Sequence, residues 1–234
     1  MKGCCITAIT GSQGSGKTTL LMALVKHISA AYTLRVQEMS FELNLRKMYS
    51  SRNILSFRET DYITGQAGLD LQKKTDGTVN ILGEVASDEV AAWMVQMSQV
   101  ASLFTLFTHH AKTFRDLIES LRNSLLKAGV FRDEATAEMQ VAGVIDFDVH
   151  LCRDAYGHRY IDRISECRRL DDTDESKCRH VENVIVEYRN GGYVAVNPIS
   201  IELQREMARE MTPGDRERFG EFLDAYWGEC TIVA

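Results

Sequence analysis

The sequence predicts an α/β protein with a mainly parallel central sheet, followed by an antiparallel β and helical extension. Three observations lead to this prediction. Short apolar runs alternate with segments of helical periodicity between Cys4 and Gly129, a pattern typical of a parallel sheet covered on both faces. A glycine-rich turn joins the first run to the first helical segment. From about Val144 apolar and polar residues alternate one by one, as in a half-buried strand.

Composition and charge limit the classes of protein that the chain can represent. It has 234 residues, of which 44% are hydrophobic and 26% charged, as in ordinary globular domains. The net charge of −6 argues against extensive nucleic-acid binding, which needs dense lysine and arginine. No apolar run approaches the ~18 residues of a membrane span, and the N-terminal residues do not form a secretory signal. We therefore expect a cytoplasmic protein without direct nucleic-acid binding.

Five buried strands are expected in the parallel region because each apolar run is short and bounded by turn or polar residues. They are Cys4–Ile9, Leu34–Gln37, Ile54–Phe57, Val79–Leu82 and Phe104–Phe107.

Three helices are predicted there from an apolar face or a capping signal. The first runs from Lys17 to about Ala30. Ser87 caps the second, and Thr113 with Asp116 forms a capping box for the third, which Gly129 ends. The side chains expected to face the core are Leu20, Leu24 and Ile28 in the first helix, Val90, Ala91, Met94 and Val95 in the second, and Leu117, Leu121 and Leu125 in the third.

The second half of the chain is expected to add antiparallel strands. Residues 145–152 alternate between apolar and polar, and Arg159–Ile164 is the expected partner strand. Val181–Tyr188 and Tyr193–Val196 flank the turn Asn190–Gly192, which predicts a hairpin. Residues 168–177 are polar and are interpreted as a loop.

A last helix is predicted from Thr212 as its cap, Pro213 at its first position and Asp215 completing the box. Its apolar stripe consists of Phe219, Phe222, Leu223, Tyr226 and Trp227. The stripe packs on the same chain in one interpretation and contacts a partner in the other. We divide the chain into residues 1–166, a first domain built on the mainly parallel sheet, and residues 167–234, an extension with the hairpin and the last helix.

The clearest functional signal is GSQGSGKTT, which fits G-x-x-x-x-G-K-[ST] between a strand and a helix. Glycines let successive backbone N–H groups point inward, and these donors with the helix N-terminus bind anions. Lys17 can reach β- and γ-phosphate oxygens, and the Thr18 hydroxyl suits Mg²⁺. The predicted ATP-binding residues are Gly11, Ser12, Gln13, Gly14, Ser15, Gly16, Lys17, Thr18 and Thr19.

Acidic residues and a histidine follow other strands, where the carboxyl ends of parallel strands meet at one edge. Glu84 follows the run that ends at Leu82, and Glu38 and Glu42 follow the second strand. Such carboxylates can hold Mg²⁺ or orient water, and we assign Glu84, partly through water, to the metal. His110 follows the strand that begins at Phe104 and can contact a terminal phosphate.

These four motifs, in this order, resemble the motor domain of the type II/type IV secretion traffic ATPases, especially the branch that assembles Tad-type and related pili. In that resemblance they are the Walker A, Asp box, Walker B and His box segments, from about Cys4 to Cys167. The segment FTLFTHHAKTFRDLIESL places His110, rather than His109, on the family histidine. Glu38 and Glu42 match acidic positions of the Asp box, and Glu84 matches the Walker B glutamate.

The resemblance implies a RecA-like P-loop fold and Mg²⁺-dependent ATP hydrolysis that drives pilus assembly, secretion or conjugative transfer. It also implies a ring, typically a hexamer, bound to a membrane secretion or pilus platform protein at the inner face of the membrane. The family's N-terminal domain is not in this sequence, so we expect either that the chain is a fragment or that a separate N-terminal domain is the partner. Three departures are Met39 for a usual Asp, Ala86 for a usual Arg, and Lys73 with Lys74 for usual arginines.

Alternative interpretations remain open at this stage. A P-loop small-molecule kinase would need an arginine-rich lid, which the motifs do not include. A nucleotide-binding regulatory subunit with little turnover would fit Met39 and the absent domain. Five residues could also form a zinc cluster, but no CxxC pair supports it and free thiols are favoured. They are His150, Cys152, Cys167, Cys178 and His180.

Overall fold

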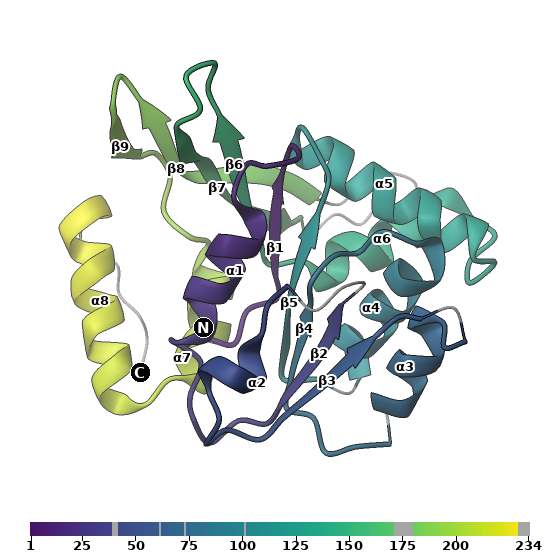
Figure 1. Cartoon of the computed structure of the whole chain (residues 1–234). Helices are drawn as coiled ribbons and strands as arrows, with labels where there is room; N and C mark the ends of the chain where they lie inside the picture. Colours follow the sequence, from purple (N-terminus) through teal and green to yellow (C-terminus); the bar gives the residue numbers. More distant parts are fainter. Residues whose placement is uncertain (39–41, 61, 73, 101, 171–179, 229–234) are drawn as a thin grey trace.

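The computed structural model describes residues 1–38, 42–60, 62–72, 74–100, 102–170 and 180–228. In this part of the chain, nine strands form one sheet in the order β3-β2-β4-β5-β1-β6-β7-β8-β9 (Figure 1). The strands are β1 (Thr7–Gly11), β2 (Leu34–Glu38), β3 (Ile54–Arg58), β4 (Val79–Leu82), β5 (Phe104–His109), β6 (Phe147–Arg153), β7 (Arg159–Arg169), β8 (His180–Arg189) and β9 (Gly192–Ala195). The helices are α1 (Lys17–Val25), α2 (Leu45–Met48), α3 (Gly65–Gln72), α4 (Asp88–Val100), α5 (Phe114–Lys127), α6 (Glu134–Val144), α7 (Ile201–Glu210) and α8 (Pro213–Trp227).

The sheet has a parallel part and an antiparallel part, which confirms the predicted fold class. Strands β3, β2, β4, β5, β1 and β6 pair in parallel. Strands β6 to β9 continue the sheet in antiparallel pairs. The carboxyl ends of β1, β2, β4 and β5 therefore meet at one edge. Strand β1 begins at Thr7 rather than at the expected Cys4, whose φ of +53° interrupts an extended backbone.

Helices cover both faces of the parallel part of the sheet. Figure 1 shows α1 and α2 on one side and α3, α4, α5 and α6 on the other. The predicted core faces of α4 and α5 are confirmed, since all of their named side chains are buried. The Ser87 cap and the Thr113–Asp116 box are also present. These contacts fix the starts of α4 and α5, the helices that follow Glu84 and His110 in the chain.

Helix α1 differs from its prediction in length and in buried face. It ends at Val25 rather than near Ala30, and Leu21 and Val25 are fully buried. The predicted Leu20 and Leu24 are partly buried against the same core. The reason is that Leu20–Val25 is apolar almost all round, so its periodicity does not single out one face.

Strand β6 is a second correction, because it is buried on both faces rather than half-exposed. Asp148 is 0% exposed and His150 is 5% exposed, so the polar side of the strand does not face water. The Thr10 hydroxyl donates to Asp148 Oδ1 at 2.6 Å and lies 2.9 Å from His150 Nδ1. Alternation predicts which residues share a side of a strand, but not that neighbouring strands supply polar partners there.

The predicted hairpin and terminal helix are confirmed. Asn190 and Gly191 have φ of +51° and +86° between β8 and β9, as a tight hairpin turn requires. Thr212 accepts a hydrogen bond from Asp215 N before α8. Residue 166, where we divide the chain, lies inside β7. Residues 171–179, with Cys178 and most of the predicted polar loop, lie outside the described residues, as does Cys230.

The stripe of α8 is divided between the chain's own core and its surface. Leu223 is buried, and Phe219 and Trp227 pack against the same small cluster. Phe222 is 43% and Tyr226 61% exposed. The cluster also contains Cys5, Ile185, Ile199 and Leu203. The same-chain interpretation therefore holds for the inner part of the stripe, while the outer rings face outward.

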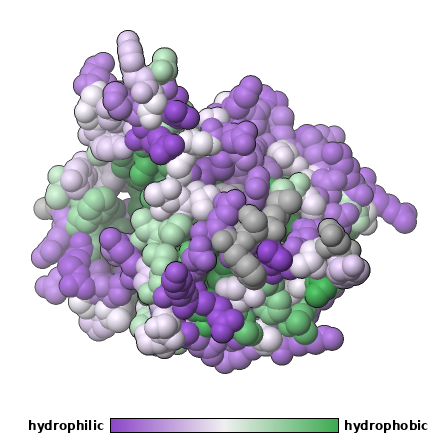
Figure 2. Space-filling model, viewed as in Figure 1, coloured by the Kyte–Doolittle hydropathy of each residue, from purple (hydrophilic) through white to green (hydrophobic). Residues whose placement is uncertain are grey.

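The surface is mainly polar on the side seen in Figure 2, with apolar residues in small separate patches. Across the described residues, none of the helices combines the length and the apolar character that a membrane crossing needs.

Candidate active site

The segment between β1 and α1 is a tight loop that glycine makes possible. Gly11, Gly14 and Gly16 have φ of +136°, +73° and +102°, a region that L side chains rarely adopt. A Cβ on Gly11 would lie 2.2 Å from the Leu151 carbonyl oxygen of β6. The loop is therefore pressed against β6, and its backbone turns at the N-terminus of α1. That geometry fits the anion-binding loop predicted from the sequence.

Lys17 lies under this loop and is 7% exposed. Its Nζ donates to the carbonyl oxygens of Gly11 and Ser12, both at 3.0 Å. Burial lowers the pKa of Lys17, and the Glu84 carboxylate opposes that shift. The ammonium is thus held at the carboxyl edge of the sheet, at the base of a cleft.

His110 joins Lys17 to Glu84. Its Nδ1 lies 3.3 Å from Lys17 Nζ, and its Nε2 lies 3.2 Å from Glu84 Oε1. An ammonium can only donate and a carboxylate can only accept. In this arrangement Nδ1 accepts from Lys17 and Nε2 donates to Glu84. The two side chains are 49% and 38% exposed, so the contact lies open to the cleft.

Glu84 is held by contacts from the two neighbouring strands. Gly83 N donates to Gln37 O of β2 at 2.8 Å. The Thr108 hydroxyl donates to Gly83 O at 2.5 Å, and Val85 N donates to Thr108 O at 2.9 Å. The turn after β4 is therefore fixed to β5, which explains why Glu84 and His110 meet.

His109 has the opposite environment from its neighbour. Its Nδ1 lies 2.8 Å from Val85 O, its Nε2 lies 3.0 Å from Ser120 Oγ, and it is 9% exposed. Burial lowers the pKa of His109. Successive side chains of a strand point to opposite faces, so one histidine braces α5 while the other enters the cleft.

Glu38 and Glu42 both line the cleft, but their carboxylates are used differently. Glu38 is 4% exposed, and its Oε1 accepts hydrogen bonds from Leu43 N at 2.7 Å and Glu42 N at 3.1 Å. Burial raises the pKa of Glu38, and these two hydrogen bonds oppose the shift. Glu38 is thus bound to the backbone of Glu42 and Leu43, while Met39 lies outside the described part of the chain.

The remaining predicted residues are distributed around the loop. Gln13, Gly14 and Thr18 line the cleft. Gly11 and Ser12 supply the carbonyls that Lys17 binds, Thr19 is exposed on α1, and Ser15 is buried. Gly16 is the N-cap of α1. Lys74 is exposed after α3, and Lys73 is outside the described residues.

Two arginines of the β6–β7 hairpin reach the loop, and sequence reasoning did not identify them. Arg159 Nε donates to Gly14 O at 2.8 Å. A Cβ built on Gly14 would lie 3.6 Å from Arg153 Nη1. The sequence predicted that residues 159–164 pair with the preceding strand, and so predicted the β6–β7 hairpin itself. The contact with Gly14 additionally requires β6 to pair with β1, which the sequence does not show.

A glycine-rich loop after the first strand, a mainly parallel sheet and an acidic strand end beside the loop are typical of the RecA-like P-loop fold. Among solved structures, the fold is similar to that of the VirB11 ATPase of the Brucella suis type IV secretion system, in complex with sulphate. The TM-score is 0.60 at 22% identity, over 69% of this chain and 48% of that one. No family model and no curated protein matches the sequence significantly.

Two further structures extend the likeness over most of the chain. The Legionella pneumophila ATPase DotB aligns with a TM-score of 0.52 at 13% identity, over 95% of this chain and 53% of DotB. The pilus retraction motor PilT with bound ADP aligns with a TM-score of 0.50 at 13% identity, over 96% of this chain and 56% of PilT. The resemblance to secretion traffic ATPases is thus confirmed at the level of the fold. The chain spans about half the length of these proteins, and the DotB and PilT alignments reach into residues after 167.

Proposed function

We propose that the chain is the Mg²⁺-dependent ATPase motor of a secretion, pilus or conjugation machine. The observation that carries this proposal is the contact series from Lys17 through His110 to Glu84 beside a glycine loop. VirB11 and DotB are described as ATPases, VirB11 was solved with sulphate and PilT with ADP. These two ligands, an oxyanion and a nucleotide, support phosphate binding by this chain.

The donors around the cleft fit Mg²⁺, which prefers oxygen ligands. The Thr18 hydroxyl and the carboxylates of Glu38, Glu42 and Glu84 all line it. We assign the ion to Thr18 and, partly through water, to Glu84. When bound, Mg²⁺ would neutralise charge on the phosphate oxygens.

The chain's own residues then have separate tasks in our proposal. Lys17 leaves its loop carbonyls or His110 to bind β- and γ-phosphate oxygens. Glu84 orients the attacking water and accepts its proton. His110 donates its Nε2 proton toward the γ-phosphate in place of Glu84, and so responds to the presence of that phosphate. Glu38 maintains the backbone that presents Glu42.

The larger assembly is also a proposal. We infer a ring, a hexamer by the family resemblance, docked on a membrane platform at the inner face of the membrane. ATP turnover would change the shape of the ring and move its substrate.

The test is phosphate release and fluorescent-ATP binding by wild type, Lys17→Ala and Glu84→Gln. Lys17→Ala should weaken ATP binding by about 10- to 100-fold, because a charged hydrogen bond contributes about 1.5–3 kcal/mol, and should abolish turnover. Glu84→Gln should keep binding and lower turnover by about 10²- to 10⁴-fold.

Lys26→Ala and Glu89→Gln are matched controls, because both residues are exposed and lie outside the cleft. Lys26 follows the last residue of α1, and Glu89 lies in α4, the helix after Glu84. They should behave as wild type. Undiminished hydrolysis in either cleft variant would remove the assignment. Transfer of phosphate to a small acceptor instead of water would identify a kinase, and binding without turnover in wild type would identify a regulatory subunit.

A further inference from the structure

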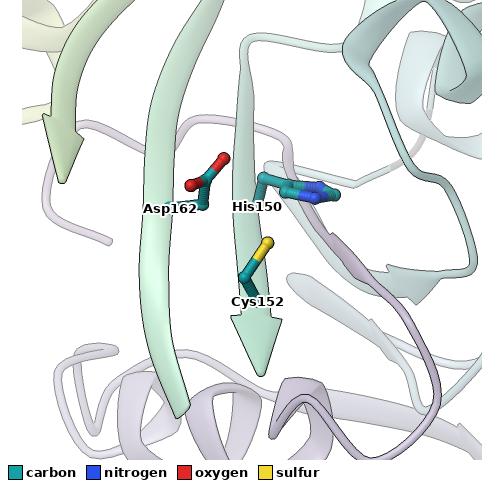
Figure 3. A group of neighbouring side chains, drawn as sticks. All are labelled: His150, Cys152 and Asp162. Carbon is teal, nitrogen blue, oxygen red and sulfur yellow. The ribbon is translucent and has the colours of Figure 1, made fainter. Parts of the chain in front are cut away.

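A second group of reactive side chains lies between β6 and β7, outside the cleft. His150 and Cys152 are two residues apart on β6 and so share a side of the strand. Asp162 comes from β7, and one potential ligand atom from each residue lies within 4.8 Å of the others. Figure 3 shows the Asp162 carboxylate directed toward β6, where the other two side chains originate.

An irregularity in the strand pairing brings Asp162 to this group. His150 pairs with Arg163 and Leu151 pairs with Ile161, so Asp162 is the extra residue of a bulge. A β-bulge redirects a side chain that regular alternation would place elsewhere. The bulge therefore brings the Asp162 carboxylate to the side of the sheet where the His150 imidazole and the Cys152 thiol lie.

The hydrogen bonds of His150 fix its tautomer. The Thr10 hydroxyl donates to Asp148 Oδ1 at 2.6 Å, because a carboxylate can only accept. The same hydroxyl must then accept the Nδ1 proton of His150, at 2.9 Å. Nε2 keeps its lone pair for coordination. An oriented second hydrogen bond of this kind is typical of metal-binding histidines.

The positive charge of Arg163 would repel a metal ion bound by these three residues. Its Nη1 lies 3.5 Å from Asp162 Oδ2, which leaves Oδ1 for another contact. The guanidinium is balanced by Glu182 Oε1 at 2.8 Å and by Asp148 Oδ2 at 3.6 Å. Three carboxylates therefore surround one arginine, and the local charge favours a divalent ion.

We propose that His150, Cys152 and Asp162 form a zinc-binding site that links β6 to β7. Imidazole, thiolate and carboxylate are the zinc donors of proteins, whereas Mg²⁺ does not select a thiolate. Three protein ligands leave a fourth position for water. On binding, the Cys152 thiol releases its proton to the solvent.

The position of the site gives it a consequence for the phosphate loop. His150 pairs with Thr10 and Leu151 with Gly11 across β6 and β1. Arg159, on the other strand of the hairpin, donates to Gly14 O. An ion bound by both strands would restrain the surface on which the loop rests. The inference does not depend on ATP turnover.

The experiment measures zinc binding by competition with a chromophoric chelator, in excess Mg²⁺ and without nucleotide. Cobalt is then substituted to look for a thiolate-to-cobalt absorption band. We expect one ion per chain, a cobalt–thiolate band and a higher thermal midpoint with zinc. Cys152→Ser should remove the band and weaken zinc binding at least about tenfold, and Thr10→Val should weaken it by about 10- to 100-fold.

His158→Gln is the matched control, since His158 is an exposed histidine of the same hairpin, 3.0 Å from Asp154. It should bind zinc as wild type does. Lys17→Ala should also bind zinc normally, so failure of the proposed ATPase function and failure of the zinc site can be told apart. The cobalt spectrum needs no variant to fold. Absence of the band in wild type, unchanged affinity in Cys152→Ser, or loss of binding in His158→Gln would each overturn the site.

Discussion

At the scale of single residues, the adjacent histidines show how one position along a strand changes chemistry. His109 bonds to Val85 O and Ser120 Oγ inside the molecule, whereas His110 contacts Lys17 and Glu84 in the cleft. The family resemblance selects His110, and the geometry places that residue beside Lys17 of the glycine-rich loop. Its catalytic role remains part of the proposed function.

This difference predicts opposite effects for two alanine variants. His109→Ala should lower the free energy of unfolding by about 1–3 kcal/mol, because buried polar groups lose their partners. His110→Ala should change it by less than about 0.5 kcal/mol, keep ATP affinity within about threefold and lower phosphate release at least about tenfold. Urea unfolding and phosphate-release assays on the two variants measure this. If both variants change the same quantity, the division between bracing and active histidine is wrong.

Glu38 shows a limit of motif reasoning at the same scale. A glutamate after a strand was predicted to serve the metal or the attacking water, and Glu38 does line the cleft. However, its Oε1 accepts two backbone N–H groups. A carboxylate engaged in this way also holds the backbone, and sequence alone does not distinguish that task from catalysis.

At the scale of elements, the capping box of α5 is a local signal that the structure reproduces in full. Thr113 accepts from Asp116 N, and Asp116 accepts from Thr113 N. Helix α5 follows directly after His110 and buries Leu117, Leu121 and Leu125. The box therefore defines where the helix that follows the two histidines begins.

We expect Thr113→Ala to lower the free energy of unfolding by about 1 kcal/mol, because the cap loses its side-chain acceptor. Thr113 is exposed, so the change leaves no cavity. Lys112→Ala, at the exposed neighbouring position, is the control and should be nearly neutral. Equilibrium unfolding in urea gives both values, and equal stabilities of the two variants would contradict the role of the cap.

Helix α1 and strand β7 show where element-level prediction fails. The apolar residues of α1 surround the helix, so the pattern leaves its buried face undecided. The bulge of β7 has no sequence signal that the alternation analysis could use. Packing on the central sheet determines the buried face of α1, and pairing with β6 determines the bulge of β7.

At the scale of the whole molecule, Asp146 joins segments that are distant in sequence. Its Oδ2 accepts from Ile6 N at 2.7 Å, and its Oδ1 lies 3.5 Å from Arg169 Nη2. Burial raises the pKa of Asp146 from 3.8 to about 6, against the hydrogen bond from Ile6 and the charge of Arg169. Glu206 and Glu166 add to the increase.

The sign of the pH effect follows from this increase. Between about pH 4 and pH 6 the folded chain binds more protons at Asp146 than the unfolded chain, so this group's contribution to stability falls as pH rises. Asp146→Asn keeps an acceptor but removes the titration. Relative to wild type, its stability should therefore increase from pH 4 to pH 7, by up to about 2–3 kcal/mol.

Urea unfolding of both proteins across this range measures the difference, in which other titrating groups cancel. Asp133→Asn is a control of opposite sign, because the hydrogen bonds of Thr136 lower the pKa of Asp133. Its stability relative to wild type should increase as the pH falls. Parallel pH curves for wild type and Asp146→Asn would show that the buried carboxylate does not titrate as described.

The sequence by itself determined the α/β class, the strand–loop–helix unit from β1 to α1, the helix caps at Ser87, Thr113 and Thr212, and the order of the site segments. These features depend on neighbours within a few residues, such as glycine spacing, capping pairs and apolar periodicity. The tertiary structure alone decided that β6 lies next to β1, that Arg159 reaches Gly14 and that Asp162 meets His150 and Cys152. Strand order and register come from the packing of distant segments, and a one-residue shift in pairing moves a side chain to the other face of the sheet.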